Sequence, residues 1–326
     1  RHHGPKAGEL TKRGGDRDMF GFIIKRSLLL IPVFFAASIV VFLLIHLVPG
    51  DPVDSLLTVG SPPEQRQIIT ERYGLDKPLI VQYGIWIGHM LRGDLGTDII
   101  MRRPVADLMA EALPYSIALG ASAFLFYTIV GVTLGVTAAL FRDRWPDRTI
   151  MTGVLFGSTL PSFWLGLLLM LIFSVWLRWL PVSGARGVSS LVLPVLTIGL
   201  GGTALVARIT RVAMVETQRK DFVMLLHAKG MHPLHIQLVR VLRHALIPVV
   251  TILALRIGFV LGGAITVEIV FARPGIGTLL VRGIMQHDYP VVQACLLMLS
   301  MAVILGTFLG DVLQALMDPR ARVSLS

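Results

Sequence analysis

Long runs of uncharged, mostly apolar residues recur along the whole of this chain of 326 residues. A helix of about 20 such residues is long enough to cross a hydrocarbon core about 30 Å thick. The runs lie at residues 27–48, 115–141, 149–177, 191–207, 247–267 and 291–316. The sequence therefore predicts an all-α, polytopic membrane protein with six transmembrane helices.

The composition of the chain is also that of a membrane protein. Hydrophobic residues make up 54% of it and charged residues 15%, whereas about a quarter of the residues in a soluble domain are charged. The single cysteine, Cys295, excludes an internal disulfide and a cysteine-based metal site. In a membrane protein, the net charge of +10 indicates Lys and Arg gathered on the cytoplasmic side rather than nucleic-acid binding.

Two polar regions flank or interrupt the membrane domain, which we expect over residues 19–326. Residues 1–18 are polar and glycine-rich, and we expect a tail there, either a tag remnant or an extended native start, with no cleavable signal peptide. Residues 51–113 form the second region, which begins at the helix-ending run Pro49-Gly50-Asp51-Pro52. We expect a small folded insertion there.

Proline and glycine residues predict local features of these regions. Within the insertion, short helices are predicted at residues 61–73, 78–91 and 104–112, the last of them closed by Pro114. Pro161 predicts a kink in the third span, which neighbouring helices can tolerate in a membrane. Gly199, Gly201 and Gly202 predict a close approach of the fourth span to its neighbours.

The distribution of charge predicts the orientation of the bundle. Six spans place both termini on one side, and the loops and tails on that side carry most of the Lys and Arg residues. The insertion at 51–113 is net acidic. By the positive-inside rule, the termini are expected in the cytoplasm and the insertion outside it.

The polar loop at residues 208–246 has helix-like spacing and is too regular for a simple connector. After Asp221, a short amphipathic helix is predicted that carries Phe222, Leu225, Leu226 and Ala228. Lys229 and Gly230 form a turn, and Pro233 begins a second helix. An apolar knob with a basic rim indicates a docking element for a soluble partner. The alternative is an interfacial helix that lies on the lipid.

Several short motifs occur together in one order and carry a family resemblance. They are Pro49-Gly50-Asp51-Pro52, Tyr73-Gly74-Leu75-Asp76-Lys77-Pro78 with Gln82-Tyr83, Gly93-Asp94-Leu95-Gly96, Ala228-Lys229-Gly230, His244-Ala245-Leu246-Ile247-Pro248, Phe271-Ala272-Arg273-Pro274-Gly275-Ile276-Gly277 and Asp288-Tyr289-Pro290. From Met19 to the C-terminus, the chain resembles the transmembrane permease subunit (B-type) of a bacterial oligopeptide/dipeptide ABC importer. The resemblance implies a type I importer permease fold in the cytoplasmic (inner) membrane of a bacterium.

The resemblance also implies a coupling helix in the polar loop, which inserts into a groove on an ATPase subunit. The residues that it assigns to this contact are Asp221, Phe222, Leu225, Leu226, Ala228, Lys229 and Gly230. Here the chain departs from the family, because Met224, Leu225 and Leu226 stand where the general pattern has Glu-Ala-Ala.

The partners and the mechanism are likewise implied by the resemblance. We expect a second, homologous permease subunit, two ATP-binding subunits and an extracytoplasmic binding protein that delivers substrate by alternating access. The chain has no Gly-Lys-Ser/Thr phosphate loop. It is therefore expected to be a non-catalytic subunit that binds no cofactor, with ATP and Mg on the partner subunits.

Three charges at or within the spans are candidates for the pathway or a gate. Arg256 lies deep in the fifth span, and Asp311 lies near the cytoplasmic end of the sixth. They are predicted either to pair with each other or to line the pathway, unless Asp311 reaches the interface alone. Glu268, at the outer end of the fifth span, is expected either at an extracellular gate or simply exposed at the interface.

Other readings of the sequence remain open. The family handles peptides, whereas relatives take nickel or another small solute. A proton-coupled secondary carrier predicts several buried carboxylates and an internal repeat, which the sequence lacks. An intramembrane hydrolase needs a base beside Ser158, Ser162 or Ser174, and the third span offers none. Four histidines of the polar loop are expected to be solvated rather than to bind metal; they are His227, His232, His235 and His244.

Overall fold

The computed structural model describes residues 7–47, 67, 76–258 and 262–317, and within these ranges the chain is helical. The elements are α1 (Ala7–Leu47), α4 (Leu79–Leu91), α5 (Val105–Leu140), α6 (Trp145–Thr159), α7 (Ser162–Met170), η1 (Leu171–Trp176), α8 (Ser189–Gln218), α9 (Asp221–Ala228), α10 (Pro233–His235), η2 (Ile236–Val241), α11 (Leu242–Ile257), η3 (Gly262–Ala264), α12 (Ile265–Val270), α13 (Ile276–Met285) and α14 (Tyr289–Met317).

Five helices are long and apolar enough to cross a membrane. They contain the segments Gly21–Leu44, Val105–Leu140, Ser189–Gln218, Pro233–Ile257 and Tyr289–Ala315. A sixth crossing is obtained if α6 is taken as one bent span with the segment that α7 and η1 form together. The all-α, polytopic architecture predicted from the sequence is therefore confirmed.

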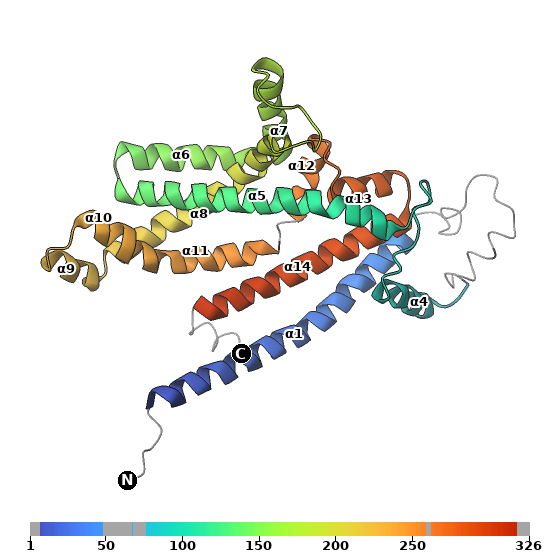
Figure 1. The fold of residues 1–326 in the computed structure, drawn as a ribbon, viewed down its shortest axis with the longest axis horizontal. Coiled ribbons are helices and arrows are strands. Elements are labelled where there is room, and N and C mark those ends of the chain that lie inside the picture. The colour runs from blue at the N-terminus through green and yellow to red at the C-terminus, as the bar shows by residue number, and fades with distance from the viewer. Residues whose placement is uncertain (1–6, 48–66, 68–75, 259–261, 318–326) are drawn as a thin grey trace, which may run out of the picture.

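The long helices form a bundle with two distinct ends (Figure 1). The short helices α9 and α10 lie at one end, and α4, α12 and α13 lie at the other. Helices α1 and α14 lie side by side, and the first described turn of α1 and the last of α14 point toward the α9 end. The loop predicted to dock a partner therefore shares one end of the bundle with the outermost described turns of the first and last helices.

Helices α5 and α8 pack closely against each other, because glycine lets their backbones meet. A Cβ on Gly135 would lie 2.5 Å from the carbonyl oxygen of Ala207, and one on Gly202 would lie 2.6 Å from the ring of Tyr127. A Cβ on Gly199 would likewise clash with the ring of Phe126, whereas a Cβ on Gly201 would lie in open space. The predicted close approach is thus confirmed at two of the three glycines.

Helices α11 and α14 also meet through small residues. Gly306 of α14 lies directly against Gly258, and Gly310 lies against the carbonyl group of Ala254. This contact fixes the depth at which the end of α11 lies relative to α14.

The third span bends much more than a simple kink. At Pro161 the chain turns by 103° between α6 and α7, and Leu160 before it has an extended backbone with ψ 133°. A residue that precedes proline is driven out of the helical region by the proline ring. The break therefore lies where it was predicted, but it makes this segment a broken span.

One predicted boundary is wrong. Residues 104–112 do not form a separate helix closed by Pro114, because α5 runs without interruption from Val105 through Pro114 to Leu140. Proline removes only one backbone donor from the helix, and membrane helices tolerate this loss when neighbours surround them. The start of α5 thereby joins the outer loops directly to the core of the bundle.

Two further spans differ from their predicted lengths. Helix α8 continues beyond Ala207 to Gln218 and carries Arg208 and Arg211 in its last turns. The predicted fifth span is interrupted, because α11 ends at Ile257 and a new helix, α12, begins at Ile265. Glycines at positions 258, 262 and 263 make helix continuation unfavourable there.

The insertion is described in part. Its amphipathic helix is confirmed as α4, whose Tyr83 and Trp86 rings pack on Phe42 of α1 with centroids 5.6 and 5.7 Å away. Tyr83 also shares a hydrogen bond of 2.8 Å with Ser38. Apart from Gln67, the predicted helix at 61–73 lies outside the described residues, as does the turn at Pro49.

Candidate functional site

Helix α9 presents an apolar face away from the bundle. Asp221, Met224, Leu225 and Ala228 are all exposed, and their spacing of three and four residues places them on one side of a helix. The exposed fractions of Met224 and Leu225 are 72% and 56%. Large apolar side chains in such a patch are typical of a surface that another protein covers.

The opposite face of α9 anchors the helix to its own chain. Val223 is buried, and Phe222 and Leu226 are partly buried against the same core cluster. The ring of Phe222 lies 5.0 Å from the ring of His244. Of the predicted contact residues, Phe222 and Leu226 therefore point inward, whereas Asp221, Leu225, Ala228, Lys229 and Gly230 are exposed.

The end of α9 is a tight turn that only glycine adopts readily. Gly230 has φ +72°, and its N–H donates to the carbonyl of His227 at 2.9 Å. The N–H of Met231 donates to the carbonyl of Leu226 at 3.3 Å. These two bonds form a Schellman cap, and Met231 then packs against the core cluster. The predicted glycine turn is confirmed.

One core cluster connects α9 to four other elements. It contains Val136 and Ala139 of α5, Ala213 and Met214 of α8, Val223 of α9, Ile236 and Val241 of η2, and Ala245 of α11. Since packed interiors deform little, a displacement of α9 is transmitted to these helices rather than absorbed.

Polar contacts reinforce this end of the bundle. The guanidinium of Arg211 in α8 donates two hydrogen bonds of 2.6 Å to the buried carboxylate of Asp147 in α6. Gln218 at the end of α8 donates to Gln237 of η2 at 2.9 Å. Paired, parallel bonds between arginine and a carboxylate hold a defined geometry. They link α6 to the helix that leads into α9.

A basic groove borders this end along the next helix. It has a volume of ≈ 500 Å³ and is lined by Val239, Arg240, Arg243, His244 and Ile247. The groove adds Arg240 and Arg243 to the basic residues of this end of the bundle.

At the other end of the bundle, Glu268 is the centre of a closed polar cluster. Its side chain is only 1% exposed. Its carboxylate accepts hydrogen bonds from the hydroxyl of Ser116 at 2.6 Å and from the N–H of Gly277 at 2.8 Å. The hydroxyl oxygen of Ser116 in turn accepts a hydrogen bond of 2.8 Å from the N–H of Ile276. Glu268 thus joins α12, α5 and the first turn of α13.

Burial dominates the electrostatics of this cluster. Desolvation raises the pKa of Glu268, although the bonds from Ser116 and Gly277 oppose the shift. Desolvation likewise lowers the pKa of Arg273, whose guanidinium donates to the carbonyl oxygens of Ser190 at 3.1 Å and Gly184 at 3.3 Å. The interfacial exposure that the sequence left open for Glu268 is wrong, because α13 and α5 enclose it.

A second acidic cluster ties the outer loop to α13 and α14. Asp98 is buried and accepts a bond of 2.6 Å from Arg282. Asp288 is buried and accepts the N–H of Ile99 at 2.9 Å, and this burial raises its pKa. Sequence reasoning used Asp288 only as part of a motif and passed over Asp98. Nothing in the local pattern tells that these two acids are buried.

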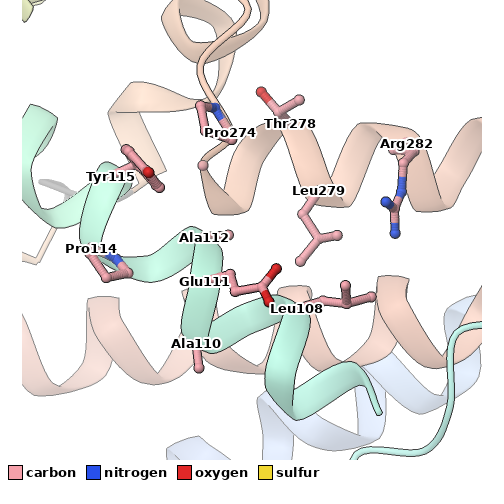
Figure 2. Close-up of a pocket in the computed structure, with 11 residues that line it drawn as sticks. Leu108, Ala110, Glu111, Ala112, Pro114, Tyr115, Pro274, Thr278, Leu279 and Arg282 are labelled. Carbon is pink, nitrogen blue, oxygen red and sulfur yellow. The ribbon is translucent and has the colours of Figure 1, made fainter. Parts of the chain in front are cut away.

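A groove of ≈ 690 Å³ lies between the start of α5 and α13 (Figure 2). Pro114, Tyr115 and Pro274 lie at one end of it, and Leu108 and Arg282 lie at the other. Glu111 also lines the groove and is ion-paired with Arg103. The groove is therefore a mixed polar and apolar recess beside the Glu268 cluster.

The two charges predicted to pair with each other do not do so. Asp311 forms an ion pair of 3.3 Å with Arg26 of α1, because α1 and α14 lie side by side. Arg256 is exposed in the last turn of α11.

Comparisons with known proteins identify the class to which this bundle belongs. The family model described as "Binding-protein-dependent transport system inner membrane component" matches residues 131–323. The corresponding model for the N-terminal part of such membrane components matches residues 19–120. Together with the helical bundle, these matches define a multi-pass permease subunit of a binding-protein-dependent ABC importer. The chain belongs to the family of binding-protein-dependent transport system inner membrane components.

Curated relatives match this chain over nearly its whole length. The "Glutathione transport system permease protein GsiC" of Escherichia coli is 40% identical over 304 residues, which cover 93% of this chain and 99% of that protein. The protein of the same name from Salmonella typhi gives the same values.

A solved structure supports the fold. The MetNI methionine ABC transporter in an inward-facing conformation superposes with a TM-score of 0.54 and 20% sequence identity, over 67% of this chain and 96% of that chain. At this identity the match shows the fold alone, which is that of a type I importer permease.

Proposed function

We propose that this chain imports di- or oligopeptides across the cytoplasmic membrane of a bacterium, as one of two homologous permease subunits. ATP and Mg bind to two separate ATPase subunits, and this chain is a non-catalytic translocation subunit. An extracytoplasmic binding protein delivers the substrate to the α13 end of the bundle. Membership of the family supports the class of importer permease. The α9 end of the bundle supports a contact with the ATPase, and the α13 end supports delivery of substrate.

The exposed apolar face of α9 carries the proposal. A permease of an ABC importer must receive work from an ATPase, and α9 is exposed on one face and anchored on the other. The contact to the ATPase is made by Met224, Leu225 and Ala228, with Asp221, Lys229 and Gly230 around them. Met224 replaces Phe222 and Leu226 in the predicted set, since those two pack inward.

The orientation of the bundle follows from charge. Arginines gather at the α9 end, in the turn between α5 and α6, in the last turns of α8 and along η2 and α11; they are Arg142, Arg144, Arg148, Arg208, Arg211, Arg219, Arg240 and Arg243. The positive-inside rule supports a cytoplasmic position for this end and for both termini.

The substrate class rests on the relatives. A permease that is 40% identical over nearly the whole chain is named for glutathione transport, and glutathione is a tripeptide. A peptide-like substrate is therefore favoured over nickel or another small solute, for which no described residue forms a recognisable site.

The two ends define a mechanism of alternating access. When the ATPase subunits close on ATP, they displace α9, and the core cluster carries that displacement into α5, α8 and α11. The Glu268 cluster holds α12 and α13 against α5 and acts as the outer gate. Arg256 lines the pathway, whereas Asp311 fastens α14 to α1 through Arg26.

Coexpression with the ATPase subunits tests the proposal. Replacing Met224 and Leu225 by Asp together should abolish co-purification of the ATPase and peptide uptake in proteoliposomes, without changing the elution volume of the permease. Val188→Asp also replaces an exposed apolar residue by a carboxylate, just before α8 and far from α9, and should leave both unchanged. Retained co-purification and uptake in the double variant would refute the assignment of α9.

A further inference from the structure

Arg256 lies near the middle of the membrane domain. Gly258 and Ala254, on either side of it, abut Val303, Thr307 and Gly310 of α14. Since α14 spans Tyr289–Met317, Arg256 lies about 10 to 20 Å from one end of that helix and about 20 to 30 Å from the other, at the usual rise per residue. Leu253, one turn before Arg256, packs in one core cluster with Tyr127, which lies near the middle of the apolar part of α5.

Within the described residues, none of the ion pairs between side chains includes Arg256. The nearest candidate on α14, Asp311, is engaged by Arg26 at 3.3 Å. Arg256 is nevertheless exposed in the isolated chain. A guanidinium at this depth is costly against lipid, and such groups face a bundle interior or a water-filled cavity. The end of α11 therefore faces a water-filled pathway or another subunit rather than the acyl chains.

The side chain of Arg256 is suited to an anionic ligand. Its guanidinium presents a planar fork of N–H donors and no acceptor. Arginine binds carboxylates through paired hydrogen bonds, which lysine cannot reproduce.

We propose that Arg256 binds the free carboxylate of the substrate midway through the membrane. This inference rests on the proposed function, and it adds that the transported peptide is recognised by a carboxylate within the permease itself. Every unmodified peptide carries such a group at its C-terminus. The site lies in the pathway, so binding there must be weak enough to allow release.

Uptake by the complete complex in proteoliposomes tests this inference. The complex contains both permeases, both ATPases and the binding protein, and the probes are a labelled dipeptide and its C-terminal amide. Arg256→Gln should lower uptake of the free acid about tenfold or more, and Arg256→Lys should restore only part of it. The ATPase rate stimulated by the binding protein and the assembly of the complex should stay within about twofold of wild type.

The amide and a control variant separate the alternatives. If the binding protein binds the peptide amide, Arg256→Gln should leave uptake of the amide unchanged. If the binding protein rejects the amide, the test is the difference in uptake of the free acid between Arg256→Gln and Arg256→Lys. Arg144→Gln, which removes an exposed arginine in the turn between α5 and α6, should leave uptake of both unchanged.

Three results would overturn the inference. Unchanged uptake of the free acid in Arg256→Gln would remove the role of the arginine. An equal loss of uptake, ATPase rate and assembly would instead identify Arg256 as the partner of an acid on the second permease. No peptide uptake by the wild-type complex would overturn the proposed function as well, so the two failures are distinguishable.

Discussion

The hydroxyl of Ser116 donates a hydrogen bond of 2.6 Å to the carboxylate of Glu268, although 152 positions separate the two residues. This bond joins a long membrane helix, α5, to the short helix α12. Through Gly277 the same carboxylate also holds the first turn of α13. The cluster explains why the outer segments lie against the bundle instead of extending away from it.

Replacing Glu268 by Ala should destabilise the protein by about 2 to 3 kcal/mol, because the N–H of Gly277 and the hydroxyl of Ser116 lose a buried acceptor. Glu268→Gln keeps an acceptor oxygen and should cost less. Thermal unfolding of the purified chain in detergent measures both. Glu111→Gln alters an exposed acid of α5 and should leave the melting temperature unchanged. Equal melting temperatures for Glu268→Ala and wild type would contradict the role of the cluster.

The pH dependence of stability should depend on Glu268. Burial raises its pKa above the ordinary value of 4.5, so the folded protein binds more protons than the unfolded chain. The stabilisation is complete below pH 4.5 and is lost as the pH rises through the raised pKa. Asp288 shifts in the same direction. As the pH rises above 4.5, the melting temperature of wild type should therefore fall relative to that of Glu268→Gln. Parallel curves would contradict this assignment.

Gly277 should not tolerate a side chain. A Cβ there would lie 2.6 Å from the Cα of Ile265 and 2.8 Å from the carboxylate of Glu268. Gly277→Ala should therefore destabilise the fold by about 1 to 3 kcal/mol, the usual cost of overpacking. Gly201→Ala is the matched control, since Gly201 also lies within a helix and has open space around it. The prediction is wrong if both variants melt together.

The ion pair between Arg211 and Asp147 should be strongly coupled. Asp147 is 3% exposed, and both of its carboxylate oxygens accept bonds from Arg211. Removing either partner leaves a charge without its partner at a partly buried position. A double-mutant cycle with Ala at each position should give a coupling energy of about 1 to 2 kcal/mol, measured by unfolding. Additive effects of the two substitutions would show that the pair contributes nothing specific.

The sequence predicted the features that depend on local pattern. The apolar runs, the break at Pro161, the amphipathic helix α4 and the glycine turn at Gly230 all follow from periodicity and backbone preference. The pairing of Asp311 could not be predicted in this way. It depends on α1 lying beside α14, and nothing near Asp311 in the sequence points to Arg26.

The same limit applies to the site on α9. Sequence spacing marks Phe222, Met224, Leu225 and Leu226 as large and apolar but does not tell which face the bundle covers. Val223 is the residue that fixes the face, because it is buried against the ends of four other helices. Because the side chain of Val223 points into the bundle, the helical spacing places the side chains of Met224 and Leu225 on the exposed face.

Cysteine crosslinking between α9 and the ATPase subunit tests the central claim most directly. In a Cys295→Ala background, single cysteines replace Met224, Leu225 and Val223, and a short thiol crosslinker is applied to the assembled complex against cysteines in the ATPase groove. Met224→Cys and Leu225→Cys should crosslink efficiently, whereas Val223→Cys should not. Crosslinking at Val223 alone, or at none of the three positions, would contradict the account of α9 as the coupling helix.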